Sequence, residues 1–142
     1  MLRYTAMIFG LLALFGCGED EAVDPRISQT SNTEVDDEFV LAPGEYTVVE
    51  GLDLIVIFHG VQQDSRCDPT VLCVWMGDAD VNIGIAPPAG GDERLASLHT
   101  HPDWPDTTSL GPEHLLRLIE LRPESTPAGQ ELYRARFRVE RR

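Results

Sequence analysis

Residues 52–59 read LDLIVIFH and form the strongest β-strand pattern in this sequence of 142 residues. Residues 54–58 are all apolar, and the three at the centre are β-branched, a composition that favours strands. An unbroken apolar run of this kind predicts a strand that is buried on both of its faces. His59 ends the run, and we interpret it as a histidine at the edge of the buried strand.

Shorter apolar runs with a period of two recur on both sides of this stretch, between turn residues. The further strands expected are residues 39–41, 45–50, 80–86, 93–99 and 133–139. In the last run, apolar side chains alternate with Arg134, Arg136 and Arg138, as in a strand with one face in water. We interpret these arginines as solvated or paired with acids on a neighbouring strand, and a dedicated anion-binding stripe is the alternative.

Residues 113–122 (EHLLRLIELR) are the one ambiguous element. Leu115, Leu118 and Ile119 fit one face of a helix, and Pro112 suits a first helical turn. The rest of the chain reads as strands, and the segment leads from Gly111 toward another strand. We therefore favour a strand here.

The length allows one ordinary domain, and the strands and turns together predict its class. Six to eight short strands, with turn residues at intervals of about ten, are typical of all-β folds. We expect an antiparallel β-sandwich or small barrel over residues 39–142, with one disulfide inside the domain.

Acidic residues outnumber basic ones by 24 to 11, and the formal net charge is −13. Every basic residue is an arginine. A nucleic-acid-binding protein needs a basic face for the phosphates, so this balance argues against that class. Residues 18–38 hold eight of the acids, one arginine and no apolar period. Low hydrophobicity with high charge predicts a disordered acidic tether over residues 17–38.

Residues 1–16 have the pattern of a secretory signal peptide. Arg3 gives a short basic start, and residues 5–16 follow with no charge. Twelve residues in a helix span about 18 Å, well short of the roughly 30 Å hydrocarbon core of a bilayer. We therefore expect export of the chain rather than a membrane-spanning helix.

The next residues, Leu14-Phe15-Gly16-Cys17, resemble the bacterial lipobox. The resemblance implies cleavage before Cys17 and attachment of a diacylglyceryl group, carrying fatty acids such as palmitate, to its thiol. Two or more acyl chains hold a protein on a membrane stably. Gly18 stands in place of the aspartate that favours the inner membrane of Gram-negative bacteria, which points to the outer membrane. Ordinary secretion with a free Cys17 is the alternative.

Cys67 and Cys73 remain as a pair once Cys17 carries lipid. In an exported protein, two such cysteines are expected to form a disulfide. Redox motifs place about two residues between the cysteines and zinc motifs about two to four, whereas five lie between these two. A structural disulfide is therefore favoured over a metal site or a catalytic thiol.

Around these cysteines the chain reads DSRCDP over residues 64–69 and VLCVWMG over residues 71–77. This pattern resembles a motif of small bacterial exported and lipid-anchored proteins. They share a Ser-Arg-Cys-Pro segment, a second cysteine and Val-Trp-Ala-Gly. Here Asp68 is inserted before the proline, and Met76 replaces the usual alanine. The family has no established activity, so the resemblance implies export and a disulfide but no chemistry.

Two loops carry the candidate binding residues. In the first loop, we expect Trp75 to pack over the disulfide or the sheet edge, and Asp64 and Arg66 to hydrogen-bond the loop. The alternative is that this cross-linked loop presents a rigid recognition surface. In the second loop, Trp104 lies between prolines and is either folded back as a lid or offered to a partner.

His99 and His101 are the most ligand-like pair in the sequence, because residues two apart in a strand point the same way. The prolines that follow them favour an irregular loop with exposed histidines instead. We expect no metal and no cofactor, with His99 and His101 as weak metal candidates. Asp78 and Asp80 are expected to cap or solvate a turn.

The sequence contains neither a nucleophile elbow nor a phosphate-binding loop, so we predict no enzyme. The expected function is a lipid-anchored, non-enzymatic binding or structural module of the cell envelope. Its expected partners are the membrane and an unknown envelope protein or polymer. The first alternative is a small inhibitor of envelope hydrolases that uses the Cys67–Cys73 loop as a wedge. The second is a metal-binding protein or enzyme centred on His99 and His101.

Overall fold

A computed structural model describes residues 28–142 of the chain. The expected signal peptide, the lipidation site at Cys17 and the first part of the expected tether lie outside the described residues. Within the described part, the regular secondary structure is all β-strand apart from one short 3-10 turn. Its elements are β1 (Ser28–Thr33), β2 (Glu38–Leu41), β3 (Glu45–Val49), β4 (Leu54–Asp64), β5 (Ala79–Ala86), β6 (Arg94–His99), β7 (Thr107–Ser109), β8 (His114–Arg122), η1 (Gln130–Leu132) and β9 (Arg134–Arg141).

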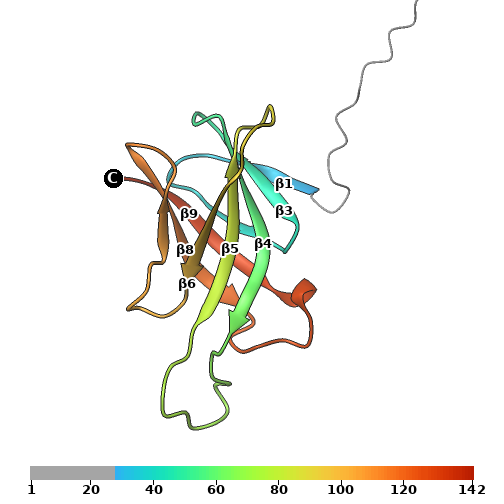
Figure 1. The fold of residues 1–142 in the computed structure, drawn as a ribbon, viewed down its shortest axis with the longest axis vertical. Coiled ribbons are helices and arrows are strands. Elements are labelled where there is room, and N and C mark those ends of the chain that lie inside the picture. Colours follow the sequence, from blue (N-terminus) through green and yellow to red (C-terminus); the bar gives the residue numbers. More distant parts are fainter. Residues whose placement is uncertain (1–27) are drawn as a thin grey trace, which may run out of the picture.

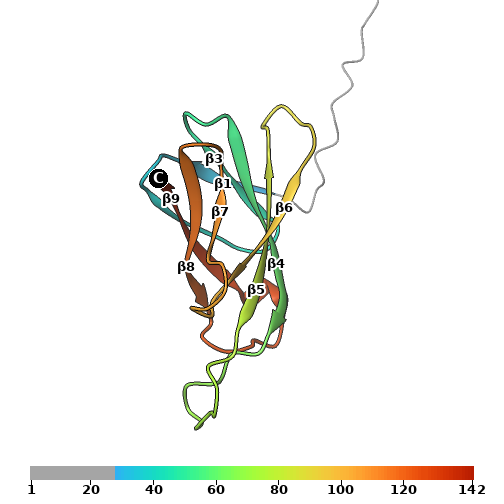
Figure 2. The same cartoon turned by 60° about the vertical axis from the view of Figure 1, so that its left-hand side comes forward.

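The strands form two sheets that pack face to face as a sandwich (Figure 1, Figure 2). The five-stranded sheet has the order β1-β3-β4-β5-β6, and the four-stranded sheet has the order β2-β9-β8-β7. The all-β prediction is confirmed, and the architecture is a sandwich rather than a closed barrel. The ambiguous segment at residues 113–122 is a strand, as favoured: β8 pairs with β7 on one side and β9 on the other.

The prediction of a disordered tether up to residue 38 is wrong for its last part. Residues 28–33 form β1, which lies parallel to β3, and the other strand pairs are antiparallel. Ser28 N donates to Gly44 O and Glu50 N donates to Thr33 O, so backbone bonds hold this polar segment. An edge strand of this kind needs little apolar burial, which is why its composition gave no strand signal. With β1 and the short β7, the described chain has nine strands rather than six to eight.

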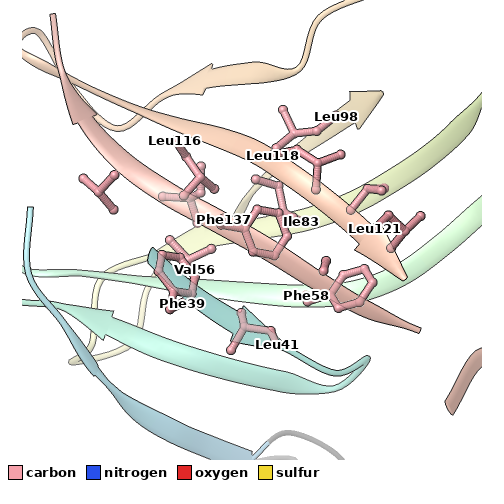
Figure 3. Close-up of a cluster of buried hydrophobic side chains, with 14 of the residues drawn as sticks. Phe39, Leu41, Val56, Phe58, Ile83, Leu98, Leu116, Leu118, Leu121 and Phe137 are labelled. Carbon is pink, nitrogen blue, oxygen red and sulfur yellow. The ribbon is translucent and has the colours of Figure 1, made fainter. Parts of the chain in front are cut away.

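The core lies between the inner faces of the two sheets (Figure 3). Its centre is aromatic: the ring centroid of Phe137 lies 5.6 Å from that of Phe39 and 6.1 Å from that of Phe58. Val56 and Ile83 line the same layer from the five-stranded sheet and are fully buried. Apolar residues at alternate positions of facing strands therefore build the core, as the period of two predicts.

The prediction that the buried strand ends at His59 is wrong, although His59 does have a hydrogen-bond partner, Glu93. β4 continues beyond His59 to Asp64, and β4 lies between β3 and β5, so His59 is exposed on the outer face of an inner strand. The register shifts between Phe58 and Gly60, which marks a β-bulge at His59. Burial on both faces holds only for the centre of the apolar run, where residues 56–58 are buried.

Two of the three arginines singled out on β9 pair with acids on the neighbouring strands, as one of the interpretations expected. Arg138 Nη2 lies 2.5 Å from Glu38 Oε1 on β2, and Arg136 Nη2 lies 3.3 Å from Glu120 Oε2 on β8. Arg134 Nη1 donates to the backbone carbonyl of Glu131 at 2.7 Å. Arg136 and Arg138 therefore form surface ion pairs on the outer face of the four-stranded sheet, whereas Arg134 bonds to the backbone.

Candidate binding surface

Two loops lie together at one end of the sandwich, where β4 and β6 end and β5 begins (Figure 1). The longer loop, residues 65–78, joins β4 to β5 and projects beyond the sheets (Figure 1, Figure 2). The second, residues 100–106, joins β6 to β7. Both line adjacent small clefts that share Arg66 and Thr100. The topology thus brings the two loops singled out in the sequence into one surface.

An ion pair fixes the base of the longer loop. Arg66 Nε and Nη2 donate to Asp64 Oδ1 and Oδ2, at 2.9 and 2.7 Å, and the backbone N–H of Arg66 also donates to Asp64 Oδ1. The third guanidinium nitrogen, Nη1, donates to the carbonyl of Leu121 in the other sheet at 2.8 Å. The side chains of Asp64 and Arg66 are only 2% and 10% exposed. The pair therefore holds the loop in place and contributes little open surface. Of the expected bonds to the loop backbone, the one from Arg66 N to Asp64 Oδ1 is present.

The environment of Asp64 stabilises its charged form. Burial alone would raise the pKa of this carboxyl, but hydrogen bonds from Arg66 and Tyr133 and the charge of Arg66 outweigh burial and lower it. For Tyr133, burial and the neighbouring Asp64 carboxylate raise the pKa of the phenol to about 12. At neutral pH the base of the loop thus contains a carboxylate, a guanidinium and a neutral phenol.

Backbone contacts close the neck of the same loop. Ser65 N donates to Asp78 O at 2.7 Å, and Asp78 N donates to Ser65 Oγ at 3.0 Å. Gly77 has φ +71°, and a Cβ at this position would overlap the backbone of Ser65. Glycine is therefore required at residue 77, because it permits both the left-handed backbone and the close approach.

The Cys67–Cys73 disulfide closes the loop beyond this neck, as predicted from the pair of cysteines. The tip around it is apolar and faces outward. The exposed side chains are those of Val71, Leu72, Val74, Trp75 and Met76. The stretch from Pro69 to Gly77 carries no charge at all.

The prediction that Trp75 packs over the disulfide or the sheet edge is wrong, since 74% of its surface is exposed. The reason is the position of the tip, which lies past the ends of both sheets (Figure 1, Figure 2). An indole there is beyond the reach of the described core. Large apolar side chains that gather in this way on a surface are typical of interaction sites.

A cleft of about 490 Å³ lies beside the neck of the loop. Arg66, His99, His101 and Trp104 line it, so four of the residues singled out in the sequence come together here. The Trp104 ring packs edge-on against His99, with the ring centroids 4.8 Å apart, and 54% of Trp104 remains exposed. Trp104 is thus partly folded back over the cleft and partly open to solvent.

Asp78 organises the second loop, a role that the sequence analysis missed. His99 Nδ1 donates to Asp78 Oδ2 at 2.6 Å, and the backbone N–H groups of Thr100 and His101 donate to Asp78 Oδ1. Burial would raise the pKa of this carboxyl, but these hydrogen bonds and the charge of His99 lower it. The contact joins residues about twenty positions apart, and we find no local sequence signal that predicts it.

His99 and His101 have different partners in the structure. His99 Nδ1 bonds to Asp78, and His101 Nδ1 accepts from the backbone N–H of Asp103 at 3.2 Å. Among residues 28–142, histidine, cysteine and acidic side chains form no group of three or more that suits a metal ion. Nothing in the described geometry therefore favours a metal at this pair.

Comparison with protein-family models, with curated proteins and with solved structures finds no match for this chain. Within the described residues, no helix has the length and apolar character needed to cross a bilayer. The geometry of the two loops is therefore the evidence on which a function is proposed.

Proposed function

We propose that this protein is a lipid-anchored, non-enzymatic binding module of the bacterial cell envelope, and that it binds another envelope protein through the tip of its cross-linked loop. The observation that carries the proposal is the exposed apolar tip, residues 71–76, on a neck fixed by hydrogen bonds and an ion pair. Burial of such a tip in a partner removes apolar surface from water.

The composition of the tip favours a protein partner. Tryptophan and methionine are enriched at the centres of protein interfaces, and charged groups collect at their rims. Trp75 and Met76 supply such a centre, and the exposed Asp68 precedes the tip in the same loop. The nearby Glu124 carboxylate is paired with Arg122. The partner that complements this surface has an apolar recess with a basic residue opposite Asp68.

The rigid neck favours binding for a second reason. The disulfide, the contacts of Ser65 with Asp78 and the ion pair of Arg66 hold the loop before any partner arrives. A preorganised loop loses less conformational entropy on binding than a flexible one. The same projecting shape also suits the alternative of an inhibitor that inserts the loop into the cleft of an envelope hydrolase.

The anchor is the second part of the proposal. Acylation of Cys17 would keep the module at a membrane surface. Because Gly18 stands where an aspartate would favour the inner membrane, we propose the outer membrane. The net charge of −13 gives no attraction to anionic head groups, so the acyl chains would supply the membrane affinity. Confinement to one surface raises the effective concentration of envelope partners.

Photo-cross-linking in intact cells tests the loop. A photoreactive amino acid is placed at Leu72, at the exposed tip, and at Val40, an exposed apolar position on β2 that serves as the matched control. We expect one protein adduct at Leu72 and none at Val40, and we expect Trp75→Ser to reduce the adduct at Leu72. Equal adducts at both positions, or adducts with phospholipid alone, would contradict a protein partner.

The anchor is tested separately with labelled palmitate. The full chain is expected to take up the label and to remain in the membrane fraction, while Cys17→Ser is expected to lose both properties. Cys67→Ser is the control, because it removes a cysteine that lies outside the lipobox. Equal membrane retention of the Cys17→Ser chain would contradict the anchor and leave the loop experiment interpretable.

A further inference from the structure

A groove of about 590 Å³ lies on the outer face of the five-stranded sheet, over β4, β5 and β6. It is separate from the loop surface, and none of its lining residues belongs to either of the two loops. Seven residues line it, Ala96 among them, and the other six have polar atoms or an exposed apolar side chain: His59, Gln62, Asn82, Glu93, Leu95 and Ser97.

The absence of a side chain at residue 84 lets two side chains of the groove approach the sheet closely. Gly84 lies in β5, and a Cβ there would overlap Glu93 Oε1 and lie 2.8 Å from His59 Nε2. These two side chains therefore meet directly above the glycine, with His59 Nε2 donating to Glu93 Oε1 at 2.6 Å. The β-bulge between Phe58 and Gly60 contributes to this geometry, since a bulge redirects the side chain that it contains.

Three uncharged polar side chains continue the groove across the sheet. Ser97 Oγ donates to Asn82 Oδ1 at 2.9 Å, and Asn82 Nδ2 donates to Gln62 Oε1 at 3.3 Å. A primary amide carries two donor hydrogens, so Asn82 keeps one, and Gln62 Nε2 donates to no other side chain or backbone group of residues 28–142. The row thus offers donors and acceptors that are already aligned by contacts with each other.

The charge of the groove favours an uncharged ligand. Its one carboxylate, Glu93, is engaged by His59, and among the seven lining residues there is no arginine. The net charge of −13 repels anions from the whole molecule. Leu95, which lies opposite Gly84 on β6, adds an exposed apolar side chain to the polar row.

We propose that this groove binds a neutral, hydroxyl-rich ligand, namely a chain of uncharged sugar residues. Such a chain presents hydroxyl donors and acceptors to Gln62, Asn82 and Ser97, and the C–H face of a sugar ring to Leu95. The site is independent of the loop surface, so its failure would leave the proposed protein partner untouched.

Affinity electrophoresis of the full chain in non-ionic detergent tests the proposal. Native gels contain one of four neutral polysaccharides (hydroxyethyl cellulose, dextran, glucomannan or glycol chitin) or the anionic polygalacturonate. The acidic protein migrates readily in such gels, and binding slows it. We expect at least one neutral polysaccharide to retard the protein and polygalacturonate not to do so.

The variant Asn82→Ala removes the amide at the centre of the row, and it is expected to weaken the retardation by about tenfold. Gln62→Ala, at an exposed residue, repeats the test should Asn82→Ala fail to fold, with folding followed by circular dichroism. Asn32→Ala is the matched control, since Asn32 is an exposed strand asparagine on β1 that bonds to Glu50 outside the groove. We expect it to bind like the unchanged chain.

Three results would overturn the proposal. The first is that none of the four neutral polysaccharides retards the protein. The second is that folded Asn82→Ala and Gln62→Ala chains are retarded as strongly as the unchanged chain. The third is that polygalacturonate binds more tightly than every neutral polysaccharide.

Discussion

The hydroxyl of Tyr133 donates to Asp64 Oδ2 at 2.8 Å, and this contact joins the end of β4 to the residue that immediately precedes β9. The two strands belong to different sheets. Because Asp64 also holds Arg66, the same carboxylate ties the loop surface to both halves of the sandwich.

The variant Asp64→Asn removes the charge that compensates the nearly buried Arg66 guanidinium. We expect it to lower the free energy of unfolding by roughly 3 kcal/mol, because loss of one member of a buried ion pair leaves the other uncompensated. Urea unfolding followed by circular dichroism measures the change. The matched control is Asp68→Asn, since an asparagine Oδ1 still accepts from Thr70; an equal loss in both variants would contradict the role of Asp64.

Acid is expected to destabilise the loop base. The pKa values of Asp64 and Asp78 are lowered in the fold from their ordinary value of 3.8. The unfolded chain therefore takes up protons first, so the stabilisation is complete above about pH 4 and is lost as the pH falls below it. The urea concentration at the midpoint of unfolding is measured as the pH is lowered from about 6 to about 2.5. It should fall less steeply for Asp64→Asn than for the unchanged chain, and equal slopes would contradict this.

Alkali is also expected to destabilise the loop base, through Tyr133. Its pKa is raised from 10.0 to about 12, so the unfolded chain loses this proton first, and stability is lost as the pH rises from 10 toward 12. Phenolate absorbance should show a component that titrates near pH 12. The Tyr133→Phe variant should lack this component, and the control variant Tyr46→Phe should keep it. If the component persists in Tyr133→Phe, it does not come from Tyr133 and the prediction is contradicted.

Gly77→Ala is expected to damage the neck of the loop. Gly51→Ala is a matched control, because Gly51 also has a left-handed φ (+82°) but has open space where a Cβ would lie. The control should lower the free energy of unfolding only by the backbone strain, roughly 1–2 kcal/mol. Gly77→Ala should lower it clearly more, because the new Cβ overlaps the backbone of Ser65. Chemical unfolding of both variants measures the difference, and equal costs would argue against a tight neck.

The disulfide is expected to stabilise the loop more than the sandwich. A chain-entropy estimate for so short a loop gives about 2 kcal/mol. The double variant Cys67→Ser, Cys73→Ser should therefore unfold at a lower urea concentration but keep its β-sheet circular dichroism spectrum. Limited proteolysis should then cut the chain within residues 67–77, and a collapse of the whole β-sheet signal would contradict this division.

The strands were predictable where apolar and polar residues alternate. Val81, Ile83 and Ile85 share one face of β5, and all three are buried, so the period of two found both the strand and its inner face. β1 gave no such signal, because an edge strand stabilised by backbone bonds needs no apolar side. The period of two therefore detects strands that bury one face, and it misses strands that pair through backbone hydrogen bonds without burying apolar side chains.

The candidate surface was predictable only in part. The cysteine pair lies close together in sequence and was found. Asp64 and Arg66 were expected to hydrogen-bond the loop, but their pairing with each other was not predicted. The contact of Asp78 with His99 depends on the pairing of β5 with β6. Trp75 was expected to pack over the disulfide or the sheet edge because it follows the second cysteine closely in sequence. The loop is long enough to carry Trp75 beyond the ends of the sheets, where it stays exposed. No local sequence pattern predicts where the tip of a loop lies.

The parallel pairing of β1 with β3 has a mechanical consequence. β1 is the first described strand, has one neighbour, and begins with the bond from Ser28 N to Gly44 O. Tension applied at its start along the strand axis loads all of its backbone bonds at once, in shear. Tension applied sideways opens them one after another, as in peeling. The resistance of this domain to a pull from its N-terminal side is therefore set by the direction of the force.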